Sequence, residues 1–269
     1  MNIFSLSFGK DSMATLILAA EQGIPIDRVL YVDIKFNDEI SGEHPIMAEW
    51  IPTAEKRLKE LFGITVEHLY YGKTFLDMYY QPLTKGKFVG GIKGFPMTIG
   101  AWCNHLKVDT VRRVWSEIKG TGEEVVEFTG IAYDEKERYE RLKKNETPKH
   151  KKRSLLFENK FTENDAKTIC EKRGLLSPVY HYDNIFRGGC WFCPKQCYAD
   201  IYSLWKNYPT YFSKLLEIEP DSHITFKPRG VTLALLAQRF ENGYIPKRKV
   251  KSKFVQLDMF DKIDGGNKE

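Results

Sequence analysis

The sequence predicts an α/β fold with an open, mostly parallel sheet flanked by helices, followed by a helical, cysteine-rich region. In the first half, short apolar segments alternate with longer segments of helical periodicity, which is typical of parallel βαβ units. In the second half the periodicity is helical, and four of the five cysteines gather in a short stretch. We expect an α/β domain over residues 1–150, a Cys-rich helical domain over 151–246, and a basic, flexible tail over 247–269.

The expected strands are short apolar runs, and the expected helices carry an apolar stripe; Gly23, Gly63 and Gly174 stand where three helices end. In chain order the strands are Ile3–Ser7, Arg28–Asp33, Ile64–Tyr70 and Val125–Gly130. The helices run from about Met13 to Gly23, Ile46 to Phe62, His105 to Ile118, Thr162 to Arg173, Tyr198 to Tyr208 and Gly230 to Phe240. Gly72–Gly100 holds six glycines and little periodicity, so it is expected to form a long loop over a site.

Composition and charge exclude several classes of protein. No apolar run approaches the roughly 20 residues of a membrane span, and no secretory signal begins the chain, so we expect a cytoplasmic protein with no membrane partner. An odd number of cysteines argues against a disulfide framework. The net charge of +5 comes from two basic segments, Lys143–Arg153 and Lys247–Lys253. These are either solvated loops or contacts for a polyanion such as DNA or RNA.

The most informative segment is Ser7-Phe8-Gly9-Lys10-Asp11-Ser12, between the first strand and the first helix. Gly9 permits a tight turn whose amides can point at an anion. The helix that begins near Lys10 adds the positive end of its dipole, and Ser7 and Ser12 offer hydroxyl donors. The segment therefore predicts a phosphate-binding turn at the carboxyl end of the first strand.

This segment resembles the PP-loop of the adenine nucleotide α-hydrolase superfamily, and in particular the phosphoadenosine phosphosulfate (PAPS) reductase family with its relatives in DNA sulfur modification. The resemblance implies a Rossmann-like (HUP) sheet and an ATP or PAPS-like adenine nucleotide, with Mg²⁺, held by residues 7–12. It also implies cleavage between the α- and β-phosphates. The family usually has Ser-Gly-Gly at the start of the loop, whereas this chain has Phe8 in the second position.

Three further segments resemble the same branch. Asp33 ends the second strand, where the family approaches the adenosine. Cys103 and Lys107 form a Cys-x-x-x-Lys segment that the family places beside the anionic groups of the nucleotide, with Arg112 and Arg113 just after it. Thr129-Gly130-Ile131 resembles a Thr-Gly-x-Arg region, in which Arg138 substitutes for the missing basic residue. The resemblance thus implies that the nucleotide also contacts Asp33, Gly130 and Arg138, and that the catalytic residues are Lys10, Asp11, Lys107 and Cys103.

The cysteine segment Gly188-Gly189-Cys190-Trp191-Phe192-Cys193-Pro194 contains a Cys-x-x-Cys pair. With Cys170 and Cys197, four thiolates would complete either a Cys₄ zinc site or a [4Fe–4S] cluster. Zinc usually favours two such pairs, and the family's Gly-Cys-Trp-x-Cys-Pro segment, which holds an iron–sulfur cluster, is similar to this one. We expect iron–sulfur, with Zn²⁺ as the alternative; Cys103 could replace Cys170 or Cys197 as a ligand.

The function that this resemblance implies is an ATP-using PP-loop enzyme that releases pyrophosphate for adenylation and sulfur transfer, with nucleic acid as its acceptor. A sulfonucleotide (PAPS/APS) reductase is the first alternative. Its nucleophilic cysteine lies in a C-terminal tail in that family, but no cysteine follows Cys197 here. The second alternative is a non-catalytic, nucleotide-binding accessory protein of the DNA machinery.

The tail carries Gln256-Leu257-Asp258-Met259-Phe260. This peptide resembles the Gln-Leu-x-Leu-Phe motif by which bacterial replication and repair proteins bind the sliding clamp, with Met259 as a volume-matched replacement. The resemblance implies the sliding clamp as a partner. The alternative is an incidental apolar patch that folds back on the body.

Overall fold

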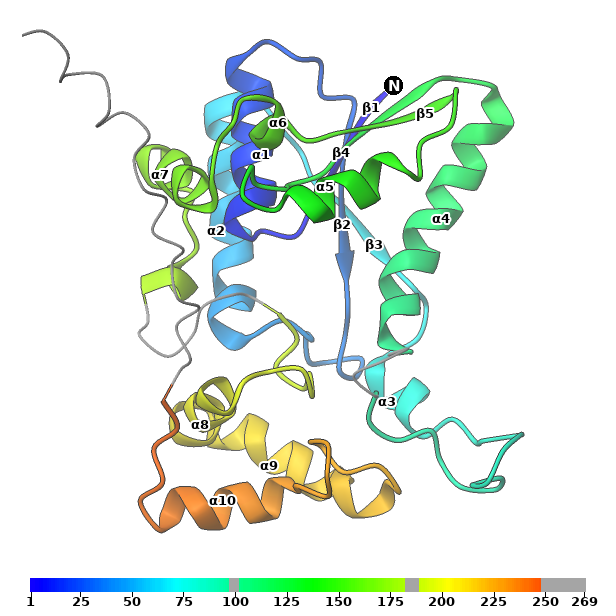
Figure 1. Ribbon diagram of the computed structural model, residues 1–269, viewed down its shortest axis with the longest axis vertical. Coiled ribbons are helices and arrows are strands. Elements are labelled where there is room, and N and C mark those ends of the chain that lie inside the picture. Colours follow the sequence, from blue (N-terminus) through cyan, green and yellow to red (C-terminus); the bar gives the residue numbers. More distant parts are fainter. Residues whose placement is uncertain (97–101, 182–188, 248–269) are drawn as a thin grey trace, which may run out of the picture.

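The structure is a computed structural model that describes residues 1–96, 102–181 and 189–247. Five strands form one sheet in the order β3-β2-β1-β4-β5 (Figure 1), and every neighbouring pair is parallel. The strands are β1 (Asn2–Leu6), β2 (Arg28–Asp33), β3 (Glu67–Tyr70), β4 (Val125–Phe128) and β5 (His150–Arg153). The prediction of an α/β fold with an open parallel sheet is confirmed.

Helices cover both faces of the sheet, and more of them follow it in the chain. They are α1 (Lys10–Glu21), α2 (Pro45–Phe62), α3 (Phe75–Tyr79), α4 (Cys103–Thr121), α5 (Lys136–Lys143), α6 (Leu155–Glu158), α7 (Glu163–Arg173), α8 (Tyr198–Asn207), α9 (Pro209–Ile218) and α10 (Leu233–Glu241). Two 3₁₀ turns span Pro178–His181 and Glu219–Asp221. Among the described residues, no helix is both long and apolar enough to cross a membrane.

Successive side chains of the central strands point to opposite faces of the sheet, so that each face has its own apolar core. Phe4 and Leu6 of β1 pack against α1 and α2, whereas Ile3 packs with Val114 and Ile118 of α4. Figure 1 shows α1 and α2 on one side of the sheet and α4 on the other. The strands are therefore buried on both faces, as parallel strands normally are.

The α/β layer continues past residue 150, where the sequence placed a domain boundary. β5 pairs with β4, and α7 packs against α1. β5 has the sequence His-Lys-Lys-Arg, which offers no apolar alternation. The Glu127 carboxylate on β4 offsets the positive charge of β5, because it lies 3.1 Å from the His150 ring and 3.2 Å from the Lys152 ammonium. Part of the basic segment expected to be a loop or a polyanion contact is thus an edge strand.

The C-terminal helices share a second apolar core with segments from the first half. Phe212 and Leu236 of α9 and α10 belong to the same cluster as Phe36, which follows β2, and Phe75 of α3. The long loop expected over Gly72–Gly100 holds α3, whose Thr74 and Asp77 form a capping box. The cysteine segment is therefore packed against the carboxyl side of β2.

Candidate functional site

Two serine hydroxyls close the turn between β1 and α1. The Ser7 amide donates to Oγ of Ser12 at 3.1 Å, and the Ser12 hydroxyl donates to the Gly9 carbonyl at 3.1 Å. Gly9 is the N-cap of α1 and has no side chain with which to cap the helix, whereas the Tyr180 hydroxyl accepts from the Lys10 amide at 3.0 Å. The first turn of α1 therefore presents its positive dipole end beside the two serines.

Phe8 holds this turn in a conformation that usually needs glycine. Its φ of 53° lies in the left-handed region. The ring is 1% exposed and packs edge-on against Tyr31, with ring centroids 5.0 Å apart. Burying a Phe ring contributes about 1.5–3 kcal/mol, which offsets the roughly 1–2 kcal/mol cost of left-handed backbone. The Phe8 side chain thus belongs to the core and does not line the nucleotide cavity that the sequence predicts.

A cavity of about 300 Å³ opens at the carboxyl ends of β1, β2 and β4. β1 and β4 are neighbours in the sheet. After β1 the chain continues to β2 on one side of this pair, whereas after β4 it continues to β5 on the opposite side. This is the switch point at which open parallel sheets bind ligands. The predicted site residues that line the cavity are Ser7, Gly9, Asp11, Ser12, Lys107, Gly130 and Arg138.

Gly130 brings the end of β4 against the backbone of α1. A Cβ atom at this position would lie 2.5 Å from both the Asp11 carbonyl carbon and the Ser12 nitrogen, closer than a carbon atom can pack. Only glycine permits this approach. Gly130 therefore positions the first turn of α1 in addition to lining the cavity.

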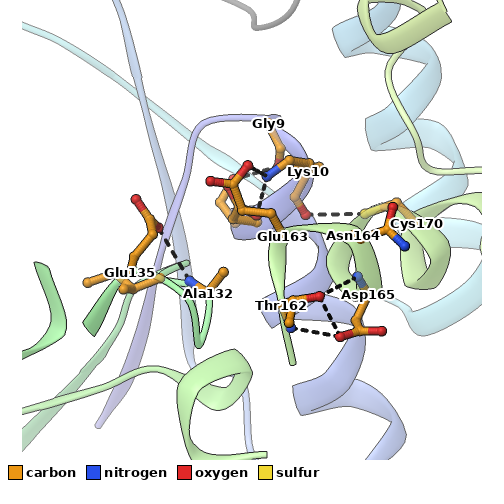
Figure 2. A network of polar contacts seen from close by, with 12 residues as sticks. Gly9, Lys10, Ala132, Glu135, Thr162, Glu163, Asn164, Asp165 and Cys170 are labelled. Atoms are coloured by element: carbon orange, nitrogen blue, oxygen red, sulfur yellow. Dashed lines mark hydrogen bonds and ion pairs between the residues drawn. The ribbon is translucent and has the colours of Figure 1, made fainter. Parts of the chain in front are cut away.

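Lys10 is not among the residues that line the cavity. Its ammonium lies 2.7 Å from Oδ1 of Asp11 and 3.1 Å from Oε2 of Glu163 on α7. Figure 2 shows Glu163 beside Lys10. Burial alone would lower the pKa of Lys10, but the hydrogen bond and charge of Asp11, with Glu163, raise it. The Lys10 amide donates to the Tyr180 hydroxyl at 3.0 Å. In this conformation Lys10 fastens α1 to α7 and does not face the cavity.

Asp11 lines the cavity while it pairs with Lys10. Burial raises the pKa of this carboxyl, although the hydrogen bond and charge of Lys10 oppose the shift. Asp33 ends β2 but does not line the cavity, whereas Tyr31 and Val32 before it do.

Two cations of the predicted set reach the cavity from different elements. Lys107 comes from α4, and Arg138, from α5, lies 2.9 Å from the Glu135 carboxylate. Arg112 and Arg113 are turned elsewhere. Arg112 pairs with Asp109 at 3.0 Å, and Arg113 donates to the Tyr71 carbonyl at 3.3 Å.

A second cavity, of about 350 Å³, brings together cysteines that are far apart in the sequence. Cys103 at the start of α4 lines it with Cys190 and Cys193, and Lys107 lines both cavities. Burial would lower the pKa of Lys107, but Cys190, Glu43, Cys103 and Cys193 raise it. Lys107 is therefore a charged ammonium between the serine turn and the thiols.

The cysteine segment is anchored by backbone contacts and by one buried indole. Cys190 forms an antiparallel bridge with Glu43, and the His44 amide donates to the Gly189 carbonyl at 3.1 Å. The Trp191 side chain is fully buried, and its indole nitrogen donates to the Ser41 carbonyl at 2.8 Å. Burial raises the pKa of both Cys103 and Cys190. These thiols are thus protonated until a positive ion displaces the proton.

A buried lysine holds the turn that follows Cys193. Lys227 is 8% exposed, and its ammonium donates to the Pro194 carbonyl at 2.5 Å and also to the Gln196 carbonyl. It lies 5.6 Å from the centre of the Tyr198 ring. Burial lowers the pKa of Lys227, and the neighbouring Cys193 and Cys197 oppose that shift. No sequence motif marks this residue.

The predicted metal ligands Cys170, Cys190, Cys193 and Cys197 do not form one group. The Cys170 thiol donates to the Lys10 carbonyl at 3.2 Å, in the core between α7 and α1 (Figure 2). Its pKa is raised to about 12 by burial. Cys197 is exposed at the N-cap of α8. Across the described ranges, no three His, Cys, Asp or Glu side chains stand in a geometry that could hold a metal ion.

Sequence reasoning missed several residues of this region. Thr129, which the sequence named within Thr129-Gly130-Ile131 but did not assign to the site, lines the first cavity, and its hydroxyl has no hydrogen-bond partner among the described residues. Tyr180, Glu163 and Lys227 carry no local pattern, because only the tertiary fold brings them to the site. The clamp-like peptide at 256–260 lies outside the described residues.

No protein-family model matches this chain, and no curated protein matches it. The functional argument therefore rests on the two cavities and on the residues that line them.

Proposed function

We propose that this chain is a PP-loop enzyme of the PAPS-reductase type, which binds ATP or a related adenine nucleotide and cleaves it at the α-phosphate. One observation carries the proposal: the serine turn, the first turn of α1, Lys107 and Arg138 all meet in a single cavity at the switch point of the sheet. Helix N-termini, hydroxyls and paired cations are the groups that bind phosphates in proteins.

The proposed reaction needs positioned donors more than covalent chemistry. An acceptor oxygen attacks the α-phosphorus, the bond to the bridging oxygen breaks, and pyrophosphate leaves with the electron pair. Ser7 and Ser12 orient the phosphates, and Lys107 and Arg138 offset the charge that develops on them. Mg²⁺ would supply further neutralisation. The acceptor is left as an adenylate, from which a sulfur donor displaces AMP.

The second cavity supports a metal at the same site. Its three thiols come from α4 and from the Cys-x-x-Cys turn, while Lys107 and Lys227 place positive charge beside them. We propose that Cys103, Cys190 and Cys193, which share the cavity but do not form a ligand group in the described conformation, close around a [4Fe–4S] cluster or Zn²⁺ when it binds, with Cys197 in the same turn as a further ligand. A cluster would supply redox-active iron and sulfide next to the nucleotide. All five cysteines are free, which fits a reducing compartment, and we propose the cytoplasm.

Pyrophosphate release from ATP tests the nucleotide proposal. Lys107→Met should reduce release at least tenfold, because it removes the charge that both cavities share, whereas the exposed control Lys172→Met on α7 should not. Sulfite release from PAPS with a thiol donor would instead assign a reductase. ATP binding without any product would assign a nucleotide-binding accessory protein.

Anaerobic purification with assays for iron, sulfide and zinc tests the metal proposal separately. Cys103→Ser should lower the metal content, and Cys170→Ser should leave it unchanged. Equal loss in both variants would contradict the ligand set that we propose.

A further inference from the structure

A short hairpin, residues 81–93, projects from the body between α3 and α4. Figure 1 shows it beside α3, directed away from the sheet. Pro82 and Ile92 form an antiparallel bridge, and the Leu83 amide donates to the Gly91 carbonyl at 2.8 Å. The Lys93 amide closes the base by donating to the Gln81 carbonyl at 2.9 Å. Backbone hydrogen bonds therefore give this projection a fixed shape.

The tip of the 81–93 hairpin exposes apolar side chains. Phe88 is 47% exposed and Val89 is 61% exposed. Burying a side chain of this size would contribute about 1.5–3 kcal/mol to folding, which the chain forgoes at both positions. Exposed apolar groups on a built projection mark a contact surface for a partner.

The same projection is positively charged. No Asp or Glu occurs between Asp77 and Asp109, whereas Lys85, Lys87 and Lys93 stand in the hairpin. The Lys87 ammonium lies 5.7 Å from the centre of the Phe88 ring, and Lys93 lies 5.6 Å from the ring of Trp102. The nearest carboxylate given by a contact is that of Asp221, which accepts from the Tyr80 hydroxyl at 2.9 Å beside the base of the hairpin. Cations beside aromatic faces, in a segment that itself has no carboxylate, are complementary to a partner that is both anionic and aromatic.

The Phe88 ring is already stacked on a neighbouring ring. Its ring lies 4.2 Å from the His223 ring at an interplanar angle of 30°. This arrangement fixes the orientation of the Phe88 ring, so that it provides a flat platform at the tip. At the base of the hairpin, Trp102 directly precedes Cys103, which lines the cysteine cavity. A strand that lies on the hairpin therefore leads toward that cavity.

We propose that the 81–93 hairpin binds single-stranded nucleic acid, with a base stacked on Phe88 and with Lys85 and Lys87 against the phosphates. A polynucleotide supplies both the repeated anions and the flat rings that this surface accommodates. The inference deepens the proposed function, because it identifies a polynucleotide as the acceptor that reaches the cysteine cavity. The binding itself requires no nucleotide cleavage.

Fluorescence anisotropy of labelled 20-nucleotide single strands, one of DNA and one of RNA, tests this on the full chain without ATP. Phe88→Ala should weaken binding about tenfold, the loss of one stacked base. The matched control is Tyr244→Ala, which removes another exposed aromatic and should leave affinity unchanged. The double variant Lys85→Gln and Lys87→Gln should reduce the magnitude of the slope of log K against log salt by about 1.4, because two lysine–phosphate contacts are lost.

Equal affinity of Phe88→Ala and the wild-type protein for both strands would overturn the inference. So would Phe88-dependent binding to vesicles with anionic lipid when neither strand binds, because the hairpin would then be a membrane contact. Preference for one strand identifies DNA or RNA. Hairpin-dependent binding without pyrophosphate release from ATP would refute the proposed function and leave this inference standing.

Discussion

Replacing Gly130 by alanine tests the link between the sheet and the first turn of α1, where we propose that phosphate binds. The added Cβ would lie 2.5 Å from two backbone atoms, the carbonyl carbon of Asp11 and the nitrogen of Ser12. Ordinary contacts of a Cβ begin at 3.4 Å, so one of the two segments must move by about 1 Å. Neither atom belongs to a side chain that could turn aside.

Two effects of Gly130→Ala can be estimated from this geometry. Overpacking of a well-packed site costs about 1–3 kcal/mol of unfolding free energy. A displacement of about 1 Å at the start of α1 also moves the phosphate donors, and misplacement on this scale lowers reaction rates by about 100-fold. The loss of activity should therefore exceed what the loss of stability alone would produce.

Urea denaturation and pyrophosphate release measure the two effects. Gly120→Ala is the matched control, since a Cβ there meets nothing within 4 Å and alanine favours the α4 helix by up to about 1 kcal/mol. We expect Gly130→Ala to be destabilised and inactive, and Gly120→Ala to be at least as stable as the wild-type protein and fully active. Full activity and stability in Gly130→Ala would refute the close approach of Gly130 to α1.

Two further predictions concern buried titratable groups near the cysteine turn. Lys227→Met should lower the unfolding free energy by about 1–3 kcal/mol, because two carbonyls lose a charged donor; an equal effect of Lys195→Met, at the exposed lysine of the same turn, would contradict this. Burial lowers the pKa of His44 to about 4 from 6.5, so protons bind the unfolded chain more tightly and stability falls as the pH drops below 6.5. We expect a loss of about 2 kcal/mol between pH 7 and pH 5, measured by denaturation at each pH. His44→Asn, which keeps an N-cap for α2, should abolish most of this loss, and an unchanged pH dependence would show that other groups cause it.

The parallel sheet could be predicted from the sequence because β1 and β2 are apolar and the segments between the strands have clear helical periodicity. β5 could not be predicted in the same way, because its strand conformation depends on pairing with β4 and on the Glu127 carboxylate. The serine turn could be proposed as a phosphate site because its candidate donors are consecutive in the chain. Lys10 was assigned to the nucleotide, yet its ammonium is held by Glu163, a residue that no local pattern connects with it.

The Cys-x-x-Cys spacing grouped Cys190 with Cys193, and both line one cavity. Cys170 was grouped with them because that residue is near in sequence, whereas the fold places Cys170 against α1. Cys103 is distant in sequence but reaches the cavity because α4 begins there. Proximity along the chain is a poor guide to which cysteines share a cavity when elements far apart in the sequence line it.

Calorimetric titration of ATP into the wild-type protein and into Lys107→Met tests the central claim most directly. The account predicts saturable binding at one site per chain, competition by pyrophosphate, and an affinity at least tenfold weaker in Lys107→Met. Absence of heat with ATP, or equal affinity in the two proteins, would contradict it.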